Sequence, residues 1–342
     1  MTAYDQTLVS LKTAPRKWLV TGAAGFIGSN LATTLLEAGQ SVVGLDNLAT
    51  GKRPNLDALQ AQGRDRFTFI EGDIRSVETW NQACQGVDCI FHEAAQVSVP
   101  ASMNDPATTH EINVTGFLHL LLAARRHRIR RIVYASSCAI YGDSTTLPLT
   151  ETTPGQPLSP YAASKLADEI YAAALSRNDG VECVGLRYFN VFGPRQDPKG
   201  VYAAVIPLWA DAMIRNQPVQ IFGDGSTSRD FCYIANVVQA NLLAATAPLS
   251  QSRHEVFNVA VGARTTLNEL FELLRSHLAP EHPHLRDFRP VYRDFRAGDI
   301  LHSHADITKA RQLLGYSPTH AVAQGLRETL EWFTKSPPQK GC

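Results

Sequence analysis

Short apolar runs alternate with longer amphipathic stretches over the first half of the chain. This is the pattern of strand–helix–strand units that feed a parallel sheet. The apolar runs predict strands at residues 18–20, 41–45, 67–70, 89–92, 131–135 and 181–187. The stretches between them predict helices at residues 27–38, 108–126 and 161–176. Together these elements predict an α/β fold with a doubly wound parallel sheet.

The regular alternation of predicted strands and helices ends at about residue 188, after which Gly- and Pro-rich segments separate shorter elements. The change predicts two domains, a first over residues 1–187 and a smaller α/β domain over residues 188–342. The segment 234–260 is expected to pack back onto the first domain, with a helix at residues 236–245. The second domain is predicted to contain helices at residues 203–214, 267–278 and 321–333, a loop at 280–290 and a frayed tail after residue 335.

Composition and charge narrow the function classes. The 342 residues are 44% hydrophobic and 19% charged, which is typical of a globular protein with a packed core. Because 32 Lys and Arg balance 32 Asp and Glu, no overall field favours nucleic acid or an anionic membrane, and we expect neither as a partner. No apolar run reaches the ~20 residues of a membrane span. Residues 1–15 lack the apolar core of a secretory signal, and the six scattered cysteines are expected to be reduced, so the expected location is the cytoplasm.

A glycine-rich turn follows the first predicted strand and opens the first predicted helix. Gly22, Gly25 and Gly28 form a G-x-x-G-x-x-G pattern, one residue longer than the commoner dinucleotide fingerprint. Glycines at such a turn let the backbone approach a pyrophosphate, whose charge the N-terminus of the helix stabilises. A tight turn that binds nothing is the alternative, and the strand–turn–helix setting argues against it. The turn predicts a Rossmann-type dinucleotide site.

Acidic residues follow the second and third predicted strands. Asp46 stands twenty-four positions after the first glycine of the turn, where a carboxylate can bind the adenosine ribose hydroxyls and would repel a 2′-phosphate. This favours NAD over NADP, although Lys52 and Arg53 nearby leave that choice open, and capping of a turn is the alternative role for Asp46. Asp73 and Ile74 are candidates for contact with the adenine, with a plain turn as the alternative.

Tyr161 and Lys165 lie four positions apart on a predicted helix and therefore share one face. Such a pair also arises by chance, but this one follows the fifth predicted strand, near whose end stands Ser137. A phenol with a pKa of ~10 is a poor base at neutral pH, so we expect the ammonium of Lys165 and a cationic nicotinamide to lower the pKa of Tyr161. Ser137 is expected to hydrogen-bond the reacting hydroxyl, and a hydroxyl bonded only to backbone is the alternative.

Metal and thiol chemistry are not expected. The pairs His282 with His284 and His302 with His304 lack further ligands at a spacing suited to a metal ion. Cys138 follows the serine pair directly, but no histidine motif accompanies it, so we interpret it as a thiol at the end of a strand.

These motifs together resemble the extended short-chain dehydrogenase/reductase superfamily. The segments Arg-Tyr-Phe-Asn-Val-Phe-Gly-Pro at 187–194 and Ser-Arg-Asp-Phe-Cys-Tyr-Ile at 228–234 narrow the resemblance to enzymes of nucleotide-sugar metabolism. Over residues 17–333 the chain looks most like UDP-hexose 4-epimerases, especially the bacterial group that acts on UDP-N-acetylglucosamine or its uronic acid. The resemblance implies that hydride leaves sugar C4 for a tightly bound NAD while the phenolate of Tyr161 takes the proton of the 4-hydroxyl. The 4-keto sugar then rotates and recovers both as the C4 epimer.

The resemblance also assigns further residues to the two ligands. At the cofactor it implies Lys165 on the nicotinamide ribose, together with Phe26, Ile27, Asn47, Ala94, Ala95 and Tyr188. At the substrate it implies Ser98 facing the sugar, Asn190 at the diphosphate, Ala204 and Val205 at the uridine, Phe222 on the uracil, Asp299 near the uridine ribose, and Arg229 and Arg296 on the diphosphate. A guanidinium matches phosphate oxygens in bidentate geometry, and a solvated surface charge is the alternative for each arginine.

One position bears on the size of the substrate. Ser303 stands where family members restricted to UDP-glucose and UDP-galactose carry a bulky Tyr, so an N-acetyl group on sugar C2 is expected to fit. The alternative is a serine that starts the next turn. Val97 with Ser98, and Cys138 with Ala139, depart from the pattern of relatives that act on UDP-N-acetylglucosamine, so the glucosamine, glucose and uronic acid forms stay open as substrates.

The sequence therefore predicts a UDP-N-acetylhexosamine 4-epimerase with resident NAD. Dehydratases of the superfamily carry an Asp-Glu pair after the catalytic hydroxyl residue and decarboxylases carry a Glu there, whereas this chain has Cys138 and Ala139. Either of these nucleotide-sugar reactions is the first alternative, and an NAD-binding regulator without activity is a remote one. The resemblance also implies a homodimer joined through the helices at residues 108–126 and 161–176.

Overall fold

The computed structural model describes residues 1–197, 204–249, 253–295 and 300–335. Its centre is a seven-stranded sheet in which every pairing is parallel. The spatial order is β11-β6-β5-β4-β1-β2-β3, so that the chain starts in the middle and winds out to both edges. The strands are β1 (Lys17–Thr21), β2 (Ser41–Asp46), β3 (Phe67–Glu71), β4 (Cys89–His92), β5 (Arg131–Ser137), β6 (Glu182–Tyr188) and β11 (His254–Val259). The predicted doubly wound fold is confirmed.

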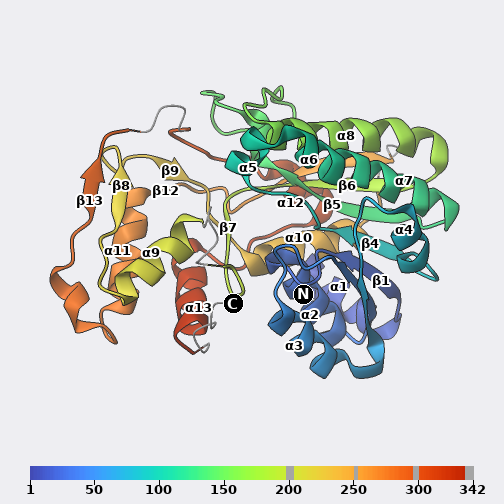
Figure 1. Ribbon diagram of the computed structural model, residues 1–342, viewed down its shortest axis with the longest axis horizontal. Helices are drawn as coiled ribbons and strands as arrows, with labels where there is room; N and C mark the ends of the chain where they lie inside the picture. The colour runs from blue at the N-terminus through green and yellow to red at the C-terminus, as the bar shows by residue number, and fades with distance from the viewer. Residues whose placement is uncertain (198–203, 250–252, 296–299, 336–342) are drawn as a thin grey trace.

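The side chains of the central strands divide between two apolar cores, one on each face of the sheet. Trp18 and Val20 of β1 belong to one core and Leu19 between them to the other, because successive side chains of a strand point to opposite faces. Helices cover both faces (Figure 1). They are α1 (Ala3–Thr13), α2 (Phe26–Glu37), α3 (Arg53–Gly63) and α10 (Ile234–Thr246) on one face, and α4 (Val77–Ala83), α7 (Gly116–Arg126) and α8 (Pro160–Asp179) on the other.

Short elements connect these helices and strands. The stretch predicted as one helix at residues 108–126 is a helix, a π-helical turn and a second helix in direct succession: α6 (Pro106–His110), Glu111–Thr115 and α7. The remaining connections are α5 (Val99–Asn104) and two 3₁₀ turns, Arg64–Arg66 and Cys138–Tyr141.

We call the seven-stranded sheet and the helices on its two faces the first lobe. A second lobe stands beside it (Figure 1). Its helices are α9 (Val205–Ile214), α11 (Leu267–Leu278) and α13 (Val322–Lys335), whereas α12 (Thr308–Leu314) packs against β11 and α10 of the first lobe. Three strand pairs accompany them: β7 (Val191–Phe192) with β10 (Cys232–Tyr233), β8 (Gln220–Phe222) with β13 (Val291–Arg293), and β9 (Ser228–Arg229) with β12 (Thr265–Thr266). The predicted loop at 280–290 contains a 3₁₀ turn, Pro283–Asp287, because its Pro residue can start a helical turn.

The polypeptide returns from the second lobe to the first. After β10 it forms α10, which packs against α1 and α2, and later β11, which pairs with β6 as the edge of the main sheet. The sequence analysis did not anticipate α1, whose N-terminus is closed by reciprocal hydrogen bonds between Thr2 and Asp5.

No helix in the described ranges combines the length and the apolar character that a membrane crossing requires. The five cysteines that the structure describes are free thiols. The predicted start of a helix at residue 203 and the tail after residue 335 lie outside the described residues.

Candidate active site

The glycine turn brings three segments of backbone into close contact. A Cβ on Gly28 would lie 2.2 Å from the carbonyl oxygen of Gly22, and a Cβ on Gly22, whose φ is +67°, would lie 3.0 Å from the amide nitrogen of Ala94. Gly25 is the N-cap of α2 and offers no side chain to the first N–H groups of the helix. Phe26 and Ile27 are the first two residues of that helix. The turn therefore forms a cradle lined by the backbone N–H groups at the start of α2. A single added Cβ would fill this cradle, which fits a pyrophosphate.

Asp46 braces the same turn. It ends β2 and is buried, and its two oxygens accept hydrogen bonds from the backbone N–H groups of Ala24 and Leu48, at 2.9 and 2.8 Å. The alternative role as a cap of a turn is therefore present in the structure. Each carboxylate oxygen has a second lone pair, so these bonds leave acceptors for the hydroxyls of a ribose.

Asp73 lies at the neighbouring strand end. The Nδ2 of Asn47 donates to Asp73 at 3.2 Å, and Arg75 forms an ion pair with Asp73 at 2.8 Å. The hydrogen bond from Arg75 lowers the pKa of the Asp73 carboxyl to about 2. The side chain of Ile74 is buried in the core beneath α7, so that only the main chain of Ile74 is available to an adenine.

Tyr161 and Lys165 lie on the first turns of α8, whose N-terminus is capped by Ser159. Ser137 stands at the end of β5 and its Oγ accepts a hydrogen bond from the backbone of Ala139. Ser137 lies near the Tyr161 phenol, whose pKa a hydrogen bond with the Ser137 hydroxyl would lower. Burial raises the pKa of the Tyr161 phenol, and the charge of Lys165 and the bond with Ser137 lower it by less. Lys165 thus acts in the expected direction, but without the cofactor the pKa is raised overall because the cost of burying a phenolate exceeds the attraction of one ammonium.

Asp168 is a partner of Lys165 that the sequence analysis missed. The Nζ of Lys165 lies 3.3 Å from Oδ2 of Asp168, and both side chains are buried. Burial raises the pKa of Asp168 to about 7 against the opposing effect of Lys165, and its Oδ1 has no partner in the described part of the chain. The three-residue spacing on the helix face of Lys165 was the signal that could have found it.

Glu93 is a second buried acid missed from the sequence. It follows β4, and its Oε1 accepts a hydrogen bond of 2.9 Å from the hydroxyl of Tyr188, to which Asn241 donates at 2.8 Å. Burial raises the pKa of Glu93 to about 8, with Tyr188 and Lys165 opposing it, and its Oε2 finds no partner among the described residues. Ala94 and Ala95 follow directly, and the amide of Ala94 is held by Thr21 at 3.1 Å.

A buried ion pair holds the ends of β5 and β6 beneath this site. The guanidinium of Arg187 on β6 donates to both carboxylate oxygens of Glu169 on α8, at 2.9 and 2.7 Å. Ser136 donates to the same carboxylate, and Arg187 also donates to the hydroxyl of Tyr141 at 2.8 Å. Because Ser136 and Arg187 are the neighbours of Ser137 and Tyr188 in sequence, this network fixes the strand ends that carry them.

Three of the predicted substrate residues lie on the side of the second lobe. Asn190 has a φ of +36° and its Nδ2 donates to the carbonyl oxygen of Asp230 at 3.2 Å. Arg229 on β9 donates to the carbonyl oxygens of Ser228 and Leu301. Ser303 is buried and its amide donates to the carbonyl oxygen of Ser228 at 3.0 Å, which brings Ser303 beside Arg229.

The other candidates are placed at the ends of elements. Ser98 is the N-cap of α5 and its hydroxyl accepts a hydrogen bond from Ala101 at 3.1 Å. Ala204 precedes Val205 at the start of α9, and Phe222 ends β8. Arg296 and Asp299 lie outside the described residues. In the described ranges no three His, Cys, Asp or Glu side chains converge in a way that could hold a metal ion.

Comparisons with known proteins agree with this geometry. The profile of the NAD dependent epimerase/dehydratase family matches residues 18–260. The UDP-glucose 4-epimerase of Mycolicibacterium smegmatis is 38% identical over 318 residues, which cover 92% of this chain and 97% of that protein. Among solved structures, UDP-glucose 4-epimerase from Thermotoga maritima with UDP-glucose matches with a TM-score of 0.85 and 37% identity over 93% of this chain and 99% of that one. UDP-N-acetylglucosamine 4-epimerase from Methanobrevibacter ruminantium, in complex with UDP-N-acetylmuramic acid, matches with a TM-score of 0.86 and 36% identity over 94% and 98%.

Proposed function

The chain belongs to the NAD-dependent epimerase/dehydratase family, and we propose that it interconverts UDP-N-acetylglucosamine and UDP-N-acetylgalactosamine by epimerisation at C4. Its enzymatic class is that of the NAD-dependent UDP-sugar 4-epimerases. The observation that carries the proposal is the placement of Ser137 at the end of β5 and of Tyr161 and Lys165 on the first turns of α8, at the carboxyl ends of the strands, where the glycine turn also lies. We assign NAD to the first lobe, residues 1–187 with 234–260, and the nucleotide sugar to the rest of the chain.

The first lobe holds the groups that an NAD molecule requires. The cradle of Gly22, Gly25 and Gly28 would receive the pyrophosphate and the free lone pairs of Asp46 the adenosine ribose. Lys165 would leave Asp168 to bind the nicotinamide ribose. When bound, NAD supplies a reversible acceptor for the hydride of C4.

The proton is moved by the residues of the chain. Tyr161 takes the proton of the 4-hydroxyl and returns it after the sugar has presented its other face. Because burial holds the phenol protonated, positive charge beside the ring is needed to make it a base, and Lys165 is the cation in place. Ser137 orients the 4-hydroxyl through its own hydroxyl. No acid stands at positions 138 and 139 to eliminate water, which favours epimerisation over dehydration.

The choice of an N-acetylated sugar is supported by Ser303. Its small side chain is buried beside the segment of Arg229, where a larger residue would occupy space that the C2 substituent needs. Relatives of both substrate classes match this chain with similar identity, so the proposal depends on this position.

Replacement of Ser303 by Tyr is expected to lower kcat/KM for UDP-N-acetylglucosamine by roughly 10- to 200-fold and to leave that for UDP-glucose within a few-fold. The ring would fill the volume of the N-acetyl group but not that of a hydroxyl. Initial rates with both substrates measure the effect, and Ser303→Thr serves as the control of intermediate size. An unchanged ratio of the two rates in Ser303→Tyr would refute the steric argument.

Proton NMR tests the activity directly. The purified protein is incubated without added cofactor with UDP-N-acetylglucosamine, UDP-glucose or UDP-N-acetylglucosaminuronic acid in parallel. We expect signals of the galacto epimer without net formation of NADH, and we expect them to appear fastest with UDP-N-acetylglucosamine. A faster reaction of either other sugar would assign that sugar as the substrate. A product of changed mass would favour a dehydratase or decarboxylase, and no reaction even with added NAD⁺ would favour a regulator without activity.

We also propose a homodimer joined through α7 and α8. These helices expose Leu122, Ile170 and Tyr171, at 38, 62 and 41% of their full accessible areas. Replacement of Ile170 by Glu is expected to convert the dimer to monomers, because a charge would be buried in an apolar contact. Sedimentation velocity measures the change. The control is Leu313→Glu on α12, where a leucine is 52% exposed away from these helices, and dissociation of both variants or of neither would contradict the proposed interface.

A further inference from the structure

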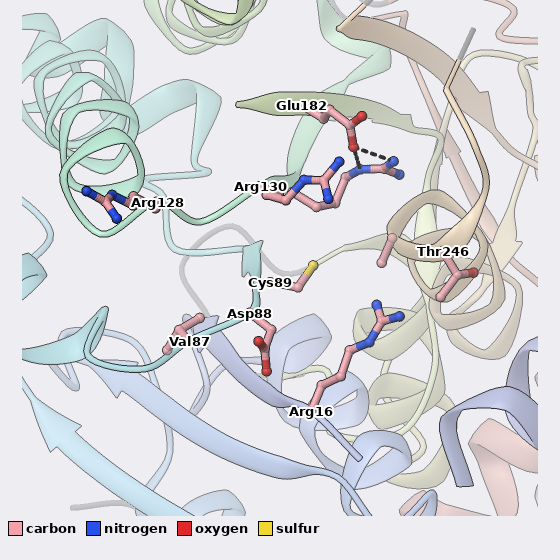
Figure 2. A pocket seen from close by; sticks show the side chains of 10 residues that line it. Arg16, Val87, Asp88, Cys89, Arg128, Arg130, Glu182 and Thr246 are labelled. Carbon is pink, nitrogen blue, oxygen red and sulfur yellow. Dashed lines mark hydrogen bonds and ion pairs between the residues drawn. The ribbon is translucent and has the colours of Figure 1, made fainter. Parts of the chain in front are cut away.

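A cavity of about 400 Å³ opens at the amino ends of the strands, on the opposite side of the sheet from the carboxyl ends that carry the candidate active site. The active-site residues follow the carboxyl ends of the strands, whereas this cavity lies at the amino ends of β1, β4, β5 and β6 and beside the last turn of α10 (Figure 2). Its lining consists of Arg16, Val87, Asp88, Cys89, Arg128, Arg130, Arg131, Glu182, Ala245 and Thr246. Nothing in the proposed epimerase reaction uses this part of the molecule.

Of the two acids in the lining, Glu182 is paired with a cation, whereas Asp88 keeps its negative charge. Glu182 accepts hydrogen bonds from Arg131 at 2.7 and 3.0 Å, and Arg131 also donates to the carbonyl oxygens of Ala244 and Ala247. Asp88 accepts a bond of 2.8 Å from the backbone of Lys17. Arg131 and Glu182 thus form a fixed, neutral wall of the cavity.

The other three arginines of the lining carry more positive charge than the single carboxylate of Asp88 balances. The guanidinium groups of Arg16, Arg128 and Arg130 form no hydrogen bond or ion pair with any residue that the structure describes, although the backbone of each is hydrogen-bonded. Figure 2 shows Arg16 extending toward Thr246 and Arg130 lying beside Glu182, whereas Arg128 points away from them.

The size and the charge together define the ligand. Guanidinium groups bind phosphate oxygens in bidentate geometry and stay charged at any working pH. Two that lack partners, facing a cavity that is larger than one phosphate and has few apolar atoms, match an anion with several charges. We propose that this cavity binds a polyphosphate group, the chemistry shared by inorganic polyphosphates and nucleoside triphosphates, through Arg16 and Arg130.

Calorimetric titration with inorganic tripolyphosphate tests the proposal on the full chain. One bound tripolyphosphate per chain is expected, and the double variant Arg16→Gln/Arg130→Gln is expected to bind at least tenfold more weakly. The double variant Arg16→Lys/Arg130→Lys, which keeps the charge but not the bidentate geometry, should be intermediate. A parallel titration with ATP distinguishes the sources, since tighter binding of ATP indicates a nucleotide and equal binding indicates the phosphates alone.

Two controls separate this cavity from other cationic surfaces. Arg286→Gln removes an exposed arginine of the second lobe, and Arg229→Gln alters the proposed nucleotide-sugar site. Both should bind tripolyphosphate as the parent protein does. Absence of binding by the parent, equal weakening by Arg286→Gln, or loss in Arg229→Gln with retention in the double glutamine variant would each overturn the proposal.

Discussion

Replacement of Tyr161 by Phe is expected to lower the rate of C4 epimerisation by roughly 10²- to 10⁴-fold, the range in which a positioned base contributes to proton transfer. The phenylalanine ring keeps the packing of α8 but cannot take the proton of the 4-hydroxyl. The burial that raises the pKa of Tyr161 makes the phenol a weak acid without further positive charge. The rate of the parent protein should therefore rise with pH as the phenol loses its proton, and the residual rate of the variant should lack this rise.

NMR time courses at several pH values measure both effects. Bound NAD, released by denaturing the protein, should be the same in parent and variant, because the hydroxyl is not part of the phosphate cradle. Tyr171→Phe on the same helix keeps the ring that the proposed dimer contact uses, removes a hydroxyl outside the candidate active site and serves as the control, with an unchanged rate expected. A Tyr161→Phe protein as active as the parent would revive the interpretation as a regulator without activity.

Replacement of Glu169 by Gln is expected to lower the free energy of unfolding by about 3–5 kcal/mol. The amide has the shape of the carboxylate but no charge, so the buried guanidinium of Arg187 would lose its counter-ion. The loss should be large because Glu169 accepts from Ser136 as well as from both nitrogens of Arg187. The midpoint and slope of urea unfolding measure it.

An exposed ion pair provides the comparison. Glu272 and Arg275 on α11 form a pair of the same kind, 2.6 Å between Nη2 and the carboxylate, with the Glu side chain about half exposed. Glu272→Gln is expected to change the free energy of unfolding by less than about 1 kcal/mol. Similar losses in the two variants would show that the Glu169 pair stabilises the protein no more than a surface pair does.

The sequence predicted the parts of the fold that carry regular periodicity. The strands near Leu19, Val43 and Val133 are apolar on both faces, as strands covered on both sides must be, so their alternation with helices was visible. The edge strand β11 contains His254, Glu255 and Asn258, which break that pattern. It was missed because its place depends on pairing with β6 and not on local sequence.

Site residues that belong to a motif of fixed spacing were predicted from the sequence. Residues whose hydrogen-bond partners are distant in sequence were missed. Gly22, Asp46 and Lys165 follow from local patterns. Glu93 became notable only because folding brings it under Tyr188, which is distant in sequence. The lowering of the Tyr161 pKa by Lys165 was predicted from their spacing, whereas the opposing effect of burial was not, because the extent of burial depends on the fold.

The return of the chain to its first lobe has a consequence for synthesis on the ribosome. When β6 has left the exit tunnel, its outer edge still lacks β11, and the face that α10 covers is bare. An unpaired strand edge and open apolar surface favour association between chains. The nascent first lobe therefore stays incomplete until α10 and β11 have been translated. A fragment that stops after residue 187 should aggregate when it is expressed alone.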